Sequence, residues 1–551
     1  MIVYGDQERW STVAEECARI VAARASLTGA GLDWHGALAR LLLEVAGLLQ
    51  GIADLEMEQA GGRDTGSPRQ GGLMRTLITL AGALDRSWQS GFADQSLPPL
   101  DLCAATDEPI CVRRPEGFAF YALYPELHAA AARVLEPGTQ VIGLRSIGTA
   151  LAPIVAAAAG SDAAATLRPV GHPFGRAPAV GETLATKITT GAVAIVDEGP
   201  GLSGSSILGT VDWLEERGVG LDHIAVLPSH AGSPGHAASE HGRARWSRLR
   251  RYVASFDDVV LEGRNPLASW FQDLTGPPLA PLEDVAGGRW RRHVGRPDLP
   301  AHPGREALKW RLVAAGGTFR IKFIGLDAAG VAAGERARFL AERGLTVAPL
   351  ALRYGMLLER WIDDAMFGLP PARNLDLLTR YLRARANMPP PTHAGASLRT
   401  LSKMARFNLA TVVGEEAAAA LLAPWGDDRL GRLQATVRPI HVDGRLHDWE
   451  WLQVGGRVLK TDAIDHSQAH DLVGPQDVAW DVAGAAIEHH LDDAQADALA
   501  AALGTSAELV AFCRLAYLAF QLGWWSETDD PQGREQARRY AALAREMAEQ
   551  R

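Results

Sequence analysis

The sequence predicts a multidomain α/β protein with an N-terminal helical module, a domain built on a parallel sheet, and a C-terminal bilobal α+β domain. Three observations lead to this fold class. The chain has 551 residues, which is too many for one hydrophobic core. Short apolar runs alternate with helical stretches between about 118 and 230. A hairpin-like segment at 310–326 precedes a long, mostly helical region.

Composition limits the classes of function. Apolar residues make up 47% and charged residues 22% of the chain, as in ordinary globular proteins. The formal net charge of −10 argues against a general nucleic-acid binder. The four cysteines lack metal-ligand spacing, and the sequence shows no signal peptide and no run of about 18 apolar residues. We therefore expect a soluble, cytoplasmic protein that acts on small molecules without a membrane partner, in an oligomeric state that the sequence does not indicate.

The first hundred residues predict a helical module. Leucines recur at helical spacing over 33–58, with Asp33 placed as the N-cap, and a second helical stretch covers 73–88. Packing alone explains both stretches, so we assign them no chemistry.

Residues 101–255 predict a parallel sheet. The apolar runs 141–144, 193–196 and 224–227 are separated by helical segments, which implies right-handed crossovers between parallel strands. Ligands of such sheets bind beyond the carboxyl ends of the strands. The loops 145–149 and 197–206 are both expected at such ends.

The stretch 193–206, VAIVDEGPGLSGSS, is the strongest local signal of this region. The adjacent carboxylates of Asp197 and Glu198 can accept the two hydroxyls of a ribose, directly or through a hydrated metal ion. The small-residue loop after them offers backbone N–H groups and hydroxyls to a phosphate at a helix N-terminus. The plainer alternative is an ordinary loop whose carboxylates cap the next helix.

This stretch resembles the phosphoribosyl diphosphate motif of type I phosphoribosyltransferases. The resemblance implies that Asp197 and Glu198 contact the ribose hydroxyls, and that phosphoribosyl diphosphate and Mg²⁺ take part. It assigns the 5-phosphate to Ser203, Gly204, Ser205 and Ser206. It assigns the diphosphate to the earlier loop Arg145, Ser146, Ile147, Gly148 and Thr149. Serines replace the usual threonines, and the segment before them is longer than in the family.

Residues 256–305 contain GPPLAPLEDVAGG and GRPDLPAHPG, which predict a Pro/Gly-rich connection between domains. The C-terminal domain is then expected over 306–551, beginning with a hairpin around Gly316 and Gly317.

This C-terminal region holds residue types that phosphoryl transfer from a nucleotide requires. One carboxylate orients the acceptor hydroxyl and a second holds Mg²⁺ against the phosphates. Asp443 and Asp462 meet these demands. Lys322 on a strand, paired with Glu335 on the following helix, would bind the phosphates.

The order of these motifs resembles the aminoglycoside and choline kinase-like phosphotransferases. His441-Val442-Asp443 matches the start of their His-x-Asp-x-x-x-x-Asn loop, but Asp448 stands at the Asn position. The resemblance implies ATP as co-substrate, Glu359 near the adenine, Gly316 and Gly317 as a short phosphate loop, and a structural role for Asp477 and Asp481. The implied metal ligands are Asp448 and Asp462, with Asp465 as a rival to Asp462.

Together these motifs predict a bifunctional enzyme. One domain would carry out phosphoribosyl transfer or its reverse, and the other would phosphorylate a small hydroxylated metabolite from ATP. Two alternatives remain open at this point: a kinase-like enzyme whose other domain only senses nucleotides, and a non-enzymatic ligand-binding scaffold.

Overall fold

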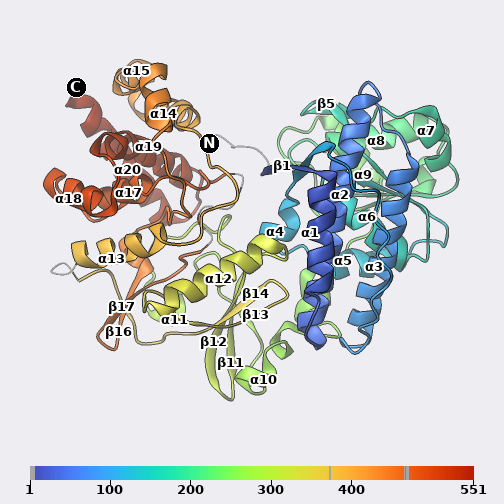
Figure 1. Cartoon of the computed structure of the whole chain (residues 1–551), viewed down its shortest axis with the longest axis horizontal. Helices are drawn as coiled ribbons and strands as arrows, with labels where there is room; N and C mark the ends of the chain where they lie inside the picture. The colour runs from blue at the N-terminus through green and yellow to red at the C-terminus, as the bar shows by residue number, and fades with distance from the viewer. Residues whose placement is uncertain (1–6, 371–373, 465, 467–468, 470, 551) are drawn as a thin grey trace.

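The computed structural model describes residues 7–370, 374–464, 466, 469 and 471–550. The helical module and the parallel sheet form one side of the molecule, and an antiparallel sheet leads from them to the C-terminal helices (Figure 1). The structure is therefore mixed α/β with a parallel sheet, as the sequence predicted.

The helical module is built on two long helices and one short antiparallel strand pair. Thr12 caps the first helix in a capping box with Glu15, and Ser67 caps the third ahead of Pro68. Asp33, predicted as an N-cap, instead lies in the first turn of the second helix, whose N-cap is Ala30. The elements are β1 (Glu8–Thr12), α1 (Val13–Ala25), α2 (Gly31–Gln59), α3 (Pro68–Gln89) and β2 (Pro109–Arg113).

Helix α2 is long and apolar enough to cross a membrane by length and composition, as is the bent pair formed by two C-terminal helices, α18 (Asp493–Leu503) and α19 (Ala507–Ser526). However, 78% of the most apolar window of α2 is buried inside the protein. Helix α2 is therefore accounted for as a core helix.

The second part is a five-stranded sheet in the order β4-β3-β7-β8-β9, in which every pairing is parallel. Its central strands are short and, apart from Gln140 at the start of β3, fully buried, which explains their continuous apolar runs. The strands are β3 (Gln140–Leu144), β4 (Ala164–Leu167), β7 (Val193–Val196), β8 (Ile224–Leu227) and β9 (Arg250–Arg251), with a separate hairpin of β5 (Val170–His172) and β6 (Gly175–Ala177). The helices are α4 (Glu116–Phe120), α5 (Pro125–Ala132), α6 (Gly148–Ala158), α7 (Glu182–Ile188), α8 (Ser205–Glu216) and α9 (Glu240–Arg248).

The third part is an antiparallel sheet in the order β10-β11-β12-β14-β13. The predicted hairpin around Gly316 and Gly317 is present between β11 and β12. The stretch 256–305, predicted as a connection, instead contributes strand β10, two short α-helices, and two other short helical segments at Asp257–Leu261 and Leu267–Ser269. The elements are α10 (Gln272–Thr275), β10 (Glu283–Asp284), α11 (Arg291–Val294), β11 (Lys309–Ala314), β12 (Gly317–Phe323), α12 (Ala328–Glu342), β13 (Pro349–Arg353) and β14 (Met356–Arg360).

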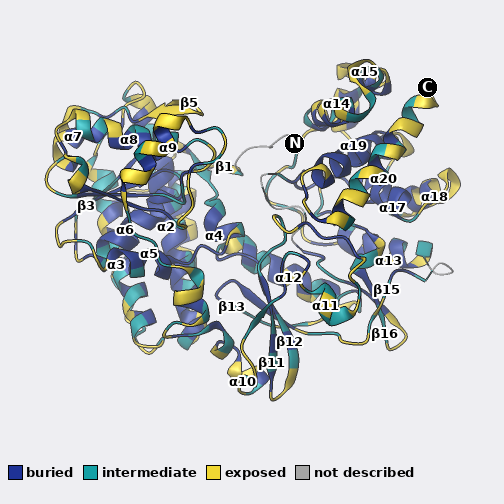
Figure 2. Cartoon of the chain, turned by 180° about the vertical axis from the view of Figure 1, so that it is seen from behind, coloured by how far each residue is buried: buried dark blue, intermediate teal, exposed yellow. Residues whose placement is uncertain are grey.

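The last part is mostly helical, as predicted, with three short antiparallel strands in the order β15-β16-β17. In Figure 2 the outer helices carry exposed residues, while α17 and α19 are largely buried. The elements are β15 (Met366–Phe367), α13 (Asn374–Ala386), α14 (Leu398–Val413), α15 (Glu415–Leu422), α16 (Asp427–Gln434), β16 (Trp451–Val454), β17 (Arg457–Lys460), α17 (Ala479–Glu488), α18 (Asp493–Leu503), α19 (Ala507–Ser526) and α20 (Pro531–Glu549).

One hydrophobic core runs through the first three parts, and a second core fills the C-terminal helices. Aromatic side chains join the first core across the expected boundaries: Phe256 stacks on Trp310 with ring centroids 5.3 Å apart, and Tyr124 lies 5.9 Å from Trp270 and 6.1 Å from Phe323. The region 256–305 is thus tied to both neighbours by packing rather than forming a loose tether.

Candidate functional site

A cleft between the antiparallel sheet and the C-terminal part gathers charged and aromatic side chains. Its lining includes aromatic residues, among them Trp290, Trp361, Phe367 and Trp449, and charged residues, among them Lys309, Arg320, Glu359 and Asp462. Its volume is about 150 Å³. Small-molecule sites usually measure roughly 300–1,000 Å³, so we expect the cleft to widen when a nucleotide binds.

Three cations converge on Asp462. Lys322 Nζ lies 2.9 Å from Oδ1 of Asp462, Arg320 Nη1 lies 3.1 Å from the same oxygen, and Lys309 Nζ lies 3.2 Å from Oδ2. Lys309 and Lys322 face each other in register across β11 and β12, and Arg320 shares the face of Lys322 because side chains alternate along a strand. Two strands therefore aim three positive charges at one carboxylate.

Electrostatics keep Asp462 ionised. Burial alone would raise the pKa of this carboxyl, but Lys309, Lys322 and Arg320 hold it well below its usual range. Asp462 has a φ of 50°, in the left-handed region that aspartate tolerates better than most residues. The structure thus brings together the predicted pair Lys322 and Asp462, which are 140 positions apart in the chain.

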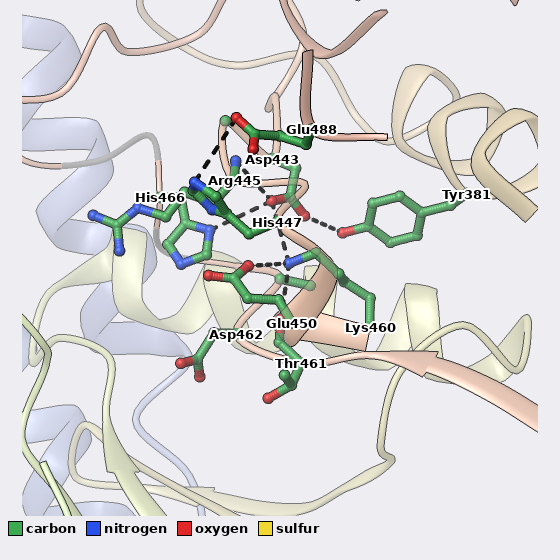
Figure 3. Close-up of polar contacts among 12 residues, drawn as sticks. Tyr381, Asp443, Arg445, His447, Glu450, Lys460, Thr461, Asp462, His466 and Glu488 are labelled. Atoms are coloured by element: carbon green, nitrogen blue, oxygen red, sulfur yellow. Dashed lines mark hydrogen bonds and ion pairs between the residues drawn. The ribbon is translucent and has the colours of Figure 1, made fainter. Parts of the chain in front are cut away.

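Asp443, the predicted acceptor-binding carboxylate, is fully buried in a network of polar side chains (Figure 3). Tyr381 donates a hydrogen bond to Oδ2, while Lys460 Nζ and His466 Nδ1 each lie 3.4 Å from Oδ1. Arg385 Nη1 lies 3.5 Å from Oδ2. Burial opposes ionisation, but Lys460, His466 and Arg385 hold the pKa of Asp443 far below its usual range.

Helix α17 fixes the loop that carries Asp443. The carboxylate of Asp481 accepts hydrogen bonds from the backbone N–H groups of Asp443 and Gly444, at 2.8 and 2.9 Å. Burial raises the pKa of Asp481 to about 6. Asp477 accepts the N–H of Arg438 at 2.9 Å. Both aspartates support the loop, as predicted.

Several predicted site residues take other positions. Glu335 is exposed on α12, where the neighbouring Arg336 is the buried residue, so Glu335 does not pair with Lys322. The carboxylate of Asp448 accepts the N–H of Leu369 at 2.8 Å, outside the cluster around Asp443 and Asp462. Glu359 does line the cleft, where Arg320 binds its carboxylate, and its place near the adenine stays a prediction.

In the predicted phosphate loop, the backbone groups of Gly316 have partners within the protein. The N–H of Gly316 bonds the Thr275 carbonyl at 2.7 Å, and its own carbonyl accepts Arg360 at 2.9 Å. The segment between β10 and β11 also supplies cleft residues, among them Trp290, His302 and Glu306. Asp465, the rival metal ligand, lies outside the described residues.

The sequence interpretation missed Lys309, Arg320, Glu450 and Lys460. Lys460 is fully buried at the end of β17, where it hydrogen-bonds Glu450 and the carbonyl of Thr461. Its pKa is raised because Asp443 and Glu450 outweigh the effect of burial, so it carries a charge. Arg320 could have been predicted, because it lies two positions before Lys322 and therefore on the same face of the strand. No feature of the local sequence predicted Glu450.

In the N-terminal half, β3 and β7 are neighbours, so the loops after them lie side by side at one edge of the sheet. Asp197 and Glu198 are partly exposed there. The N–H of Glu198 donates to Oδ1 of Asp197 at 2.9 Å. Burial raises the pKa of Asp197 to about 7, against the opposing effects of that hydrogen bond and of Arg176.

The serine loop is covered by the β5–β6 hairpin. The Ser205 hydroxyl donates to the Pro173 carbonyl at 2.9 Å, and Ser203 lies 3.1 Å from Ser205, oxygen to oxygen. Gly204, with a φ of 72°, is the N-cap of α8, so the loop does lead into a helix N-terminus. Ser206 is half-buried in the first turn of that helix.

Arg145 does not face a ligand, contrary to its predicted role. Its side chain is 1% exposed and is bound by Asp54 Oδ1 at 3.0 Å, by Asp64, and by Thr166 Oγ1 at 3.2 Å. The two aspartates belong to the helical module, so Arg145 ties that module to the sheet.

The rest of the same loop is also packed inward. Ile147, Gly148 and Thr149 are buried, and a Cβ on Gly148 would lie 2.9 Å from the Val196 carbonyl oxygen. Ser146 is the loop residue that lines a large cleft between the two halves of the molecule. The side chains of this loop therefore supply little that could hold a diphosphate.

No protein-family model matches the sequence. A search of curated proteins also finds no match. Among solved structures, the chain is similar to choline kinase LicA from Streptococcus pneumoniae at 14% identity, over 44% of this chain and 90% of that one, with a TM-score of 0.32. It is also similar to a choline/ethanolamine kinase family protein from Mesorhizobium loti, at 18% identity over 50% and 90% of the two chains, with a TM-score of 0.31.

A third similar structure is the spectinomycin phosphotransferase APH(9)-Ia in complex with ADP and spectinomycin. It is 11% identical over 51% of this chain and 96% of that one, with a TM-score of 0.34. These likenesses are distant, and the functional proposal below rests on the side chains of the cleft.

Proposed function

We propose that the C-terminal half is a phosphotransferase that moves the γ-phosphoryl group of ATP to a hydroxyl of a small molecule. The observation that carries this proposal is the convergence of Lys309, Arg320 and Lys322 on Asp462 in a cleft with aromatic walls. Positive groups that neutralise phosphate charge, next to a carboxylate, are the main requirement of phosphoryl transfer.

Nucleotide binding would exchange the partners of these cations. The phosphate oxygens would take over Lys309, Arg320 and Lys322, which now bind Asp462. The released carboxylate faces the cleft and, together with phosphate oxygens, forms the hard oxygen donor set that magnesium prefers. Asp462 is therefore the residue of this cleft that would hold Mg²⁺, which when bound neutralises and orients the phosphates.

Asp443 would orient the acceptor. In the reaction the bond from the γ-phosphorus to its bridging oxygen breaks, while a bond to the acceptor oxygen forms. Because its pKa is far below its usual range, Asp443 is a weak base. Its role is then to hold the hydroxyl in line, and the proton leaves to water after transfer. An acceptor can approach the buried carboxylate only if a partner such as His466 gives way.

The test is ATP turnover with pooled hydroxylated metabolites as acceptors. We expect turnover by the wild type, its loss in Asp443→Asn, and loss of ATP binding in Lys322→Met. Exposed Lys403 offers a matched control, and Lys403→Met should behave as the wild type. Wild-type protein that neither binds nor consumes ATP would refute the proposal.

We infer a second function for the N-terminal half, namely binding of a phosphoribosyl ligand with ionised Asp197 and Glu198 on the ribose hydroxyls. The partly exposed carboxylates at the carboxyl edge of a parallel sheet favour it, as does the serine loop that leads into α8. Since Arg145 is occupied, the exposed Arg176 on β6, which acts electrostatically on Asp197, is the better source of positive charge.

Phosphoribosyl diphosphate with Mg²⁺ should raise the melting temperature of the wild type but not of Asp197→Asn/Glu198→Gln. Release of diphosphate with an added base would indicate transfer, in which the C1–oxygen bond breaks as a bond to the nucleophile forms. Binding without release would favour the sensor alternative. Absence of any shift would refute the second function.

A further inference from the structure

Beside the cleft, three side chains are arranged as they would be in a metal site. Asp443, Glu450 and His466 each offer one ligand atom, and these atoms lie within 4.8 Å of one another. Two carboxylates and an imidazole are ordinary ligands of divalent cations.

A positive charge of the protein already lies in this set. The ammonium of Lys460 is 3.4 Å from Oδ1 of Asp443, hydrogen-bonds Glu450, and also donates to the Thr461 carbonyl at 3.0 Å (Figure 3). The Lys460 side chain is fully buried. A divalent ion between the carboxylates would meet this ammonium at short range in a medium of low dielectric constant, where like charges repel strongly.

The other surroundings add positive charge. Arg385 Nη1 lies 3.5 Å from Oδ2 of Asp443, and the N–H of Arg445 donates to Oδ1 at 3.1 Å. The Asp443 and Glu450 carboxylates therefore already have cationic and hydrogen-bonding partners. The donor atoms suit a metal ion, but the ammonium of Lys460 already lies between the carboxylates where the ion would bind.

We propose that Lys460 is a built-in cation that takes the place of a divalent metal ion between Asp443 and Glu450. The nucleotide complex then holds a single divalent ion, at Asp462, and the positive charge near the acceptor comes from the protein. Lys460 holds Asp443 and Glu450 in place without contacting the phosphates, so it is a positioning residue. The count of ions in the nucleotide complex rests on the proposed phosphotransferase function.

Removing the ammonium should create the metal site. We expect Lys460→Met to gain one tightly bound Mn²⁺ in the free protein, with ¹⁴N coupling from His466 in pulsed electron paramagnetic resonance. The wild type and the exposed-lysine control Lys403→Met should lack this signal. Lys460→Met/Glu450→Gln should lose it again, because one carboxylate of the set is gone.

The same measurement with a non-hydrolysable ATP analogue counts the ions of the complex. We expect one Mn²⁺ per chain in the wild type and two in Lys460→Met. Two Mn²⁺ ions per chain in the wild-type complex would overturn the inference. This result needs no variant, so the inference can be tested even if Lys460→Met does not fold. An unchanged Mn²⁺ count in folded Lys460→Met would also overturn it. Failure of the analogue to bind would contradict the proposed phosphotransferase function. The experiment on the free protein would still test whether Lys460 takes the place of a metal ion.

Discussion

Replacing Arg145 by methionine tests whether this residue supports the fold or binds a ligand. Its guanidinium is 1% exposed and is shared by Asp54 and Asp64, and the Asp64 side chain is 2% exposed. Methionine keeps most of the side-chain volume but removes the charge, which leaves Asp64 buried without its cation. Removing one partner of a buried ion pair costs about 3–5 kcal/mol.

Thermal unfolding measures this effect. A loss of that size should lower the melting temperature of Arg145→Met by at least about 5 °C. Arg133 is the matched control because its pair with Asp85 is at the surface, with the Arg133 side chain 44% exposed. Surface pairs contribute about 0–1 kcal/mol, so Arg133→Met should change the melting temperature little.

The pH dependence gives a second readout of the same variant. Burial raises the pKa of Asp64 against the opposing effect of Arg145. Without the guanidinium this pKa rises further, so folded Arg145→Met binds a proton that the unfolded chain releases. The variant should therefore recover stability as the pH falls towards 5, and Arg145→Met/Asp64→Asn should recover it at neutral pH. Arg145→Met that unfolds like the wild type but fails to bind phosphoribosyl diphosphate would refute this reasoning and restore Arg145 as a ligand contact.

Three further predictions follow from the site geometry. Because Glu335 is exposed, Glu335→Gln should keep ATP turnover within about twofold of the wild-type rate. Lys322→Met should reduce turnover by at least about a hundredfold. Similar losses in both variants would show that Glu335 pairs with Lys322 after all. The pKa of Asp197, about 7 in the folded protein, exceeds that of an unfolded carboxyl, so the wild type should lose stability as the pH rises from about 4 to about 7. Asp197→Asn should remove this slope in melting experiments, and an unchanged slope would contradict the assignment. Gly143→Ala should destabilise the protein by at least about 1–3 kcal/mol, because the Cβ of the new alanine would lie 2.0 Å from the Gly148 carbonyl oxygen. An unfolding midpoint equal to that of the wild type would show that the loop after β3 can shift freely.

Much of the fold could be predicted from the sequence because its signals are local. The apolar runs at 141–144 and 193–196 predicted buried parallel strands, and parallel strands bring the loops after them to one edge. The order of Lys322, Asp443 and Asp462 likewise predicted one site, and Lys322 and Asp462 do meet at 2.9 Å.

The errors arise where contacts depend on distant parts of the chain. Arg145 looked available because nothing near it in sequence reveals Asp54 and Asp64, which come from the helical module. Glu335 differs from the buried Arg336 by one position, and one position turns a helix residue by about 100°. The Pro/Gly-rich stretch 256–305 was expected to be a tether, but Trp270 and Phe271 within it are buried in the first core.

Asp448 shows the limit of counting positions along a loop. The prediction placed a metal ligand at a fixed spacing after Asp443, but Asp448 turns towards Leu369. Glu450, the residue directly before β16, is the one that reaches Asp443 and Lys460. The start of β16 places Glu450, and its position in space cannot be obtained by counting residues from Asp443.

The most direct test of the account is a crystal structure with Mg²⁺ and a non-hydrolysable ATP analogue. The account predicts phosphate oxygens within hydrogen-bonding distance of Lys309, Arg320 and Lys322, with Asp462 released from these cations and bound to the metal ion. An analogue bound elsewhere, with Asp462 still held by all three cations, would contradict the account.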